Sequence, residues 1–162
     1  MGPSAAVLLP YTPSSVAVAR HRLVSDLAAA GIYETVVGDA ALVVTELLSN
    51  AIRHAAPLPG AQVRVTWTLD HDAVRVAVSD AGDGLLPHVT EPAPGAPGGR
   101  GLGIVESLSD HWGVQRDNGE TTVWAQLAAP PVPPVPVADP PSPTPVTAPG
   151  QSVSYKHSVA EA

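Results

Sequence analysis

The chain has 162 residues, 44% of them hydrophobic, which suits one domain with a buried core plus an appendage. Its formal net charge of -7 argues against a nucleic-acid-binding surface, and the absence of cysteine excludes disulfides and thiolate metal sites and suits a reducing compartment. No apolar run reaches the roughly 20 residues of a membrane span, and no basic segment with a long apolar core marks a signal peptide. We therefore expect a cytoplasmic protein that binds neither nucleic acid nor membrane.

The first predicted element is a helix from Ser14 to about Ala30. Ser14 and Ser15 are residue types that cap helices, and Gly31 is typical of a helix end. A second helix is predicted over residues 34–55, because its apolar residues recur at helical spacing and a proline follows at position 57.

The next two segments alternate between apolar and polar residues and are predicted to form a hairpin. They are 61–69 (AQVRVTWTL) and 73–80 (AVRVAVSD), joined by a turn at 70–72. After a loop rich in glycine and proline, a third helix is expected over 102–110, and strands over 113–116 and 121–127. The predicted fold class is α/β, a two-layer arrangement with a mostly antiparallel sheet and helices on one face.

The composition changes near residue 130. Proline, valine and alanine dominate the stretch AAPPVPPVPVADPPSPTPVTAPG, and proline lacks the N–H that helices and sheets need. We expect one domain over residues 1–129 and an extended, disordered tail over 130–162. The tail is either passive or a docking segment for a proline-reading partner, since PPVPPVP offers P-x-x-P spacing.

Three polar residues follow one margin of the apolar face of the second helix. Glu46, Asn50 and His54 are spaced four apart, so they step along one ridge. A partly shielded carboxylate needs a partner, and one candidate is a metal ion to which Asn50 supplies an oxygen ligand. Taken alone, the pattern favours a surface helix whose polar residues face solvent.

Two glycine-rich motifs follow. In SDAGDG, Asp80 ends an apolar strand and can accept a hydrogen bond from an exocyclic amine, while Gly82 and Gly84 let the backbone approach a flat ring. In GGRGLG, the glycines leave the backbone N–H groups accessible where a helix begins, which favours phosphate binding. Arg100 adds a charged hydrogen-bond donor. Each motif alone also fits an ordinary turn or a flexible loop.

In combination, the motifs resemble the GHKL, or Bergerat-type, ATP-binding fold of histidine kinases, type II topoisomerases and MutL. TELLSNAIRH corresponds to the N box, DAGDG to the first glycine box and GRGLG to the second. The closer resemblance is to the anti-sigma-factor serine kinases and the small histidine-kinase-like ATP-binding regulators of actinobacteria. It rests also on the Ala19–Arg20 pair, on GRGLGIVESLSDHWGV and on the closing TVWAQL, and covers about residues 7–128.

The resemblance implies roles for individual residues. Asn50 would coordinate the Mg²⁺ that bridges the ATP phosphates, Glu46 would be the general base for a serine hydroxyl, and Asp80 would accept the adenine amino group. The other implied nucleotide contacts are Gly82 and Gly84 at adenine, Arg100, Gly101, Leu102 and Gly103 at phosphate, and Thr122 at adenine. His54 either approaches the phosphates or simply completes the helix.

The implied function is that of a Mg²⁺-ATP-binding regulator with serine/threonine protein kinase activity. Its substrate would be an anti-anti-sigma-like protein, it would also bind a sigma factor, and it would form a homodimer as related proteins often do. Two alternatives stay open: a non-catalytic module in which ATP only orders a partner-binding surface, and the detached catalytic domain of a sensor histidine kinase. The latter is disfavoured because no helical hairpin with a phosphoacceptor histidine precedes the N box.

Overall fold

The computed structural model describes residues 2–82, 101–133 and 136. The chain divides into two units, Met1–Val132 and Pro133–Ala162. The second unit lies almost entirely outside the described residues, so the extended tail stays a prediction. All elements below belong to the first unit.

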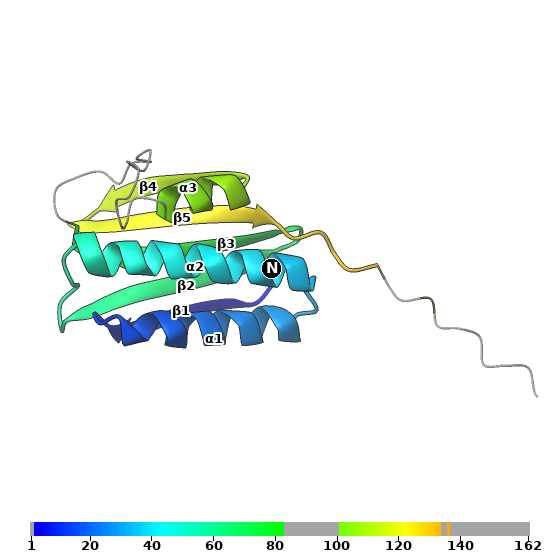
Figure 1. The fold of residues 1–162 in the computed structure, drawn as a ribbon, viewed down its shortest axis with the longest axis horizontal. Helices are drawn as coiled ribbons and strands as arrows, with labels where there is room; N and C mark the ends of the chain where they lie inside the picture. The colour runs from blue at the N-terminus through cyan, green and yellow to red at the C-terminus, as the bar shows by residue number, and fades with distance from the viewer. Residues whose placement is uncertain (1, 83–100, 134–135, 137–162) are drawn as a thin grey trace, which may run out of the picture. The chain divides into compact units, whose positions relative to one another are not determined.

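Five strands form one sheet in the order β1-β2-β3-β5-β4, and every neighbouring pair is antiparallel (Figure 1). Their bounds are β1 Ser4–Pro10, β2 Gln62–Asp70, β3 Ala73–Asp80, β4 His111–Asp117 and β5 Glu120–Ala128. Three helices, α1 Ser14–Ala29, α2 Glu34–His54 and α3 Gly101–Leu108, cover one face of the sheet. The predicted two-layer α/β fold is therefore confirmed.

Strand β1 was not predicted. It lies at the edge of the sheet and pairs with β2, from Ser4 opposite Thr68 to Pro10 opposite Gln62. Its sequence SAAVLLP shows no polar–apolar alternation after Ser4, because the other outward residues are alanine, leucine and proline. Only the pairing with a strand almost 60 residues away makes it extended.

The first helix starts where the sequence predicts, but the cap differs. Pro13 occupies the N-cap position, and no side chain caps the helix. The Ser15 hydroxyl instead donates a hydrogen bond to the carbonyl oxygen of Pro10 at 2.5 Å, which ties the helix start to the end of β1. Gly31, with φ of +75°, follows the helix as predicted.

The core fills the space between the helices and the sheet. α2 contributes its apolar stripe, and β2, β3 and β5 contribute the valines and leucines of alternate positions. The Trp67 indole N–H also donates to Asp26 Oδ2 at 3.0 Å and so fastens α1 to β2. By length and hydropathy α2 would pass as a membrane span, but its apolar residues are the centre of this core.

Candidate functional site

A buried carboxylate stands at the end of strand β3. Asp80 is the last residue of β3, is only 3% exposed, and lies on the face of the sheet that the helices cover. Its Oδ1 accepts a hydrogen bond from the backbone N–H of Gly82 at 2.6 Å. Gly82 has φ of +70°, a conformation that glycine adopts without the steric cost of a Cβ. The predicted D-x-G motif is thus a hydrogen-bonded turn that holds one carboxylate oxygen in place.

The end of α2 is fastened beside this turn. The Ala81 N–H donates to the carbonyl oxygen of Ala56 at 2.9 Å. The Tyr11 hydroxyl lies 2.6 Å from the carbonyl oxygens of both Ala51 and Ala55, and its single proton serves one of them at a time. Tyr11 was not singled out from the sequence, and nothing local could have done so, because its partners lie 40 and 44 residues away.

Thr121, rather than the predicted Thr122, lies next to the aspartate turn. Asp80 pairs with Thr121 in the β3–β5 register, and Thr121 is buried on the same face. A Cβ on Gly82 would lie 2.7 Å from Thr121 Oγ1, closer than real contacts allow. Thr122 faces the other side of the sheet, where its hydroxyl is 2.7 Å from that of Ser79.

The sequence already indicates which of the two threonines faces the core. Val123, Ala125 and Leu127 are the apolar, core-facing residues of β5, and period-two alternation places residue 121 on their face. The match of the closing strand to the family motif pointed to Thr122. The alternation of side chains along β5 instead places Thr121 on the core-facing side.

The structure brings together two motifs that are 55 residues apart in the sequence. Gly101 is the first residue of α3, which packs against α2. A Cβ on Gly101 would lie 2.8 Å from Glu46 Oε2, so a side chain at residue 101 would push the glutamate carboxylate away from the start of α3. Glu46 is half-buried, as the position at the margin of the apolar stripe predicts.

The other residues of the ridge on α2 differ in exposure. Asn50 lies one turn after Glu46 and is half-buried, whereas His54 is exposed in the last turn. This difference favours the simpler role for His54, that of completing the helix. A histidine in the last turn also suits the negative end of the helix dipole.

The remaining predicted contacts are divided between described and undescribed parts of the chain. Leu102 is buried and belongs to the core, whereas a Cβ on Gly103 would meet no atom within 4 Å. Gly84 and Arg100 lie outside the described residues, as does the loop rich in glycine and proline between them.

Comparisons with known proteins identify the family. The family model described as "Histidine kinase-like ATPase domain" matches residues 9–127. The chain therefore belongs to this family, which confirms the predicted relationship and implies ATP binding. None of the curated protein sequences matches the chain.

A solved structure shares the fold. The RsbU and RsbW domains of Rv1364c from Mycobacterium tuberculosis superpose with a TM-score of 0.60 at 21% sequence identity. The match covers 80% of this chain and 33% of that one, so the present chain corresponds to about a third of that structure. At this identity, the likeness is one of fold.

Proposed function

We propose that this chain is a cytoplasmic ATP-dependent serine/threonine protein kinase of the anti-sigma-factor type, with a small anti-anti-sigma-like protein as its substrate. The observation that carries the proposal is the position of the Glu46 carboxylate against Gly101, where α3 begins. A helix start binds phosphate through its free N–H groups. A carboxylate at that point is placed to take the proton of a hydroxyl that attacks the phosphate.

The adenine end of the proposed site is the Asp80 turn. A carboxylate oxygen accepts hydrogen bonds through more than one lone pair, so the Asp80 carboxylate can accept one from the exocyclic amino group of adenine as well as from the Gly82 N–H. Guanine presents a carbonyl oxygen at that position, and two acceptors facing each other repel. The buried Thr121 hydroxyl beside the turn supplies a further polar contact.

We also propose that the site takes a magnesium ion together with ATP. Within residues 2–82, 101–133 and 136, no group of three or more His, Asp or Glu residues could hold a metal ion. An ion here would take most of its ligands from ATP phosphates and water, as Mg²⁺ commonly does, with the Asn50 side-chain oxygen as its protein ligand. When bound, it would neutralise charge on the phosphates.

Nucleotide binding is the first test. Titration calorimetry on the full chain should give binding of ATP that depends on Mg²⁺ and exceeds binding of GTP. Asp80→Asn should abolish it, because the amide can present its NH₂ to the adenine amino group. Asp70→Asn, which removes an exposed carboxylate at the far end of β3's hairpin, should leave it unchanged. Equal affinity for ATP and GTP would contradict the role given to Asp80.

Phosphoryl transfer needs a separate test. Anti-anti-sigma-like proteins whose genes lie near the gene of this chain would be incubated with the chain and ATP. Phosphoserine or phosphothreonine in these proteins would then be located by mass spectrometry. Glu46→Gln should keep ATP binding and lower the rate by about 10²–10⁴-fold, the usual contribution of a general base. ATP-dependent partner binding without any phosphoprotein would favour the non-catalytic module, and phosphohistidine would favour a histidine kinase domain.

The proposed partner switch would work by charge. A phosphate on the substrate serine adds close to two negative charges at the partner's interface and would break that complex. The chain would then be available to bind a sigma factor. Sedimentation of the full chain, alone and with each partner, tests both this exchange and the predicted homodimer.

A further inference from the structure

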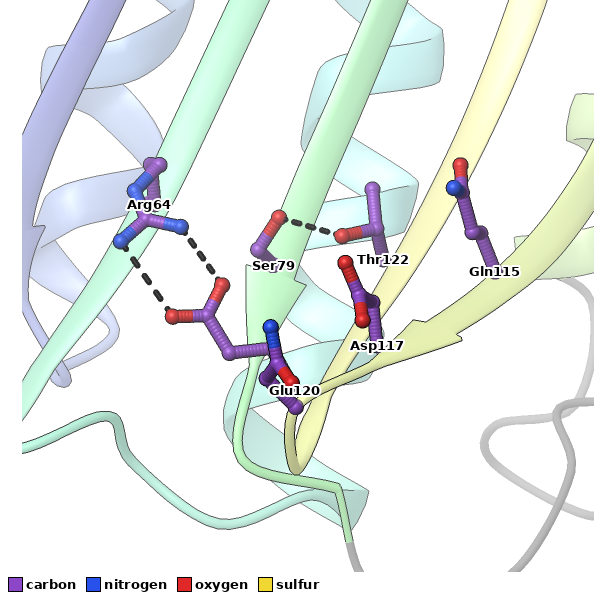
Figure 2. A pocket seen from close by; sticks show the side chains of 7 residues that line it. Arg64, Ser79, Gln115, Asp117, Glu120 and Thr122 are labelled. Carbon is purple, nitrogen blue, oxygen red and sulfur yellow. Dashed lines mark hydrogen bonds and ion pairs between the residues drawn. The ribbon is translucent and has the colours of Figure 1, made fainter.

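A polar pocket lies on the face of the sheet opposite the helices (Figure 2). Its volume is about 320 Å³, and its lining residues are Arg64, Ser79, Gln115, Asp117, Asn118, Glu120 and Thr122. Ser79 and Thr122 are the sequence neighbours of Asp80 and Thr121, and residues alternate between the two faces of a strand. The pocket is therefore separated from the proposed nucleotide site by the thickness of the sheet.

The pocket carries an uncompensated negative charge. The Arg64 guanidinium contacts both oxygens of Glu120, at 2.6 and 3.4 Å, so these two charges offset each other. Figure 2 shows Asp117 beside this pair, at the start of the β4–β5 turn. Within the described part of the chain, the Asp117 carboxylate forms no ion pair or side-chain hydrogen bond.

The uncharged groups of the pocket add hydrogen-bond acceptors. Ser79 is more than nine-tenths buried, and its hydroxyl shares one hydrogen bond of 2.7 Å with Thr122, which leaves lone pairs on both oxygens. The side-chain amides of Gln115 and Asn118 each offer a carbonyl oxygen. A ligand that matches this lining is a cation with several N–H donors.

We propose that the pocket binds the guanidinium group of an arginine side chain presented by a protein partner. Arginine carries five N–H donors in a planar fork, which suits carboxylate and carbonyl oxygens at the same time. The volume is near the lower limit of about 300–1,000 Å³ for small-molecule sites, so it suits one long side chain better than a larger ligand. A basic partner also complements the net charge of -7.

The surroundings of the pocket favour a protein over a free small cation. Trp124, two residues along β5 from Thr122, lies flat against Gly113, where a Cβ would come within 2.9 Å of the ring. The Arg75 guanidinium stacks on the same ring, 4.1 Å from its centroid. Aromatic and arginine side chains dominate protein–protein interfaces, and here they continue the same sheet face.

The test uses the full chain labelled with ¹⁵N and the tripeptide acetyl-Gly-Arg-Gly-amide as probe. The peptide should cause saturable shifts of the backbone amides of Ser79, Gln115 and Thr122. The isosteric citrulline peptide, which has no charge, should not. Asp117→Asn should weaken binding about threefold or more, and Gln115→Leu should weaken it without a change of charge. Asp70→Asn, the matched loss of an exposed carboxylate outside the pocket, should have no effect.

The outcomes separate the possible occupants. Equal shifts from the arginine and citrulline peptides, or shifts that Asp117→Asn leaves unchanged, would overturn the proposal. Tighter binding of putrescine than of the arginine peptide would also overturn it, because the pocket would then serve a free polyamine. The spectra of the variants report their folding directly, so a misfolded variant is recognised before binding is compared. None of these readouts depends on ATP, so the proposal stands or falls separately from the kinase.

Discussion

Replacing Gly82 by alanine tests how the candidate site is built. The change has two separable costs. The φ of +70° is left-handed, which costs a residue with a Cβ about 1–2 kcal/mol. The new Cβ would also lie 2.7 Å from Thr121 Oγ1, so the threonine must leave its rotamer, at about 0.5–1.5 kcal/mol.

Gly31 supplies the matched control. Its φ of +75° is almost the same, but a Cβ there would meet no atom within 4 Å. Gly31→Ala should therefore show the backbone cost alone, and Gly82→Ala should lose about 0.5–1.5 kcal/mol more. Thr121→Ala in the Gly82→Ala background should recover that difference, because it removes the hydroxyl that the new Cβ meets.

Urea unfolding followed by tryptophan fluorescence measures all four proteins, with the m-value as the check that the unfolded states are comparable. Calorimetry with ATP on the same samples shows whether the displaced threonine matters for the nucleotide. If the two glycine variants lose equal stability, or if Thr121→Ala recovers nothing, then Gly82 and Thr121 are not in contact and the geometry of the site is wrong.

Three further changes probe other contacts. Tyr11→Phe should lower the free energy of unfolding by about 0.5–1.5 kcal/mol in urea, because the last turn of α2 loses a hydrogen bond; an unchanged midpoint would show that water replaces it. Arg64→Met should lower the free energy of unfolding by less than about 1 kcal/mol, since the ion pair with Glu120 is partly exposed. Added salt should reduce the difference in stability between the variant and the native chain. A larger loss of stability would mean that the ion pair holds the sheet together. Gly101→Ala should preserve stability yet slow phosphoryl transfer by about 10²-fold, because the new Cβ displaces the Glu46 carboxylate; an unchanged rate would exclude Glu46 as the base.

Local patterns were sufficient for most of the elements. The helix of residues 34–55 and the strands of 61–69 and 73–80 were each predicted within a residue or so of their observed ends. Their side chains repeat every 3.6 or every two residues, and burial of one face enforces that repeat. The same periodicity placed Glu46 and Asn50 at the margin of the apolar stripe, where both are half-buried.

Pairing between distant segments was decided only by the tertiary structure. Strand β1 has no local signal and exists because β2 offers it a free edge. The hydrogen bonds of Tyr11, the contact of Glu46 with Gly101, and the ion pair of Arg64 with Glu120 join residues 40 or more positions apart.

The fold class and the motifs of a nucleotide site could be predicted from the sequence, because periodicity, glycines and chain order are local properties. The tertiary structure decided which threonine lies opposite Asp80 and which glycine the Glu46 carboxylate approaches closely. It also decided that a charged pocket forms on the opposite face of the sheet. Those outcomes depend on strand register and on the close approach of α3 to α2, and both are set by packing between segments that are far apart in the chain.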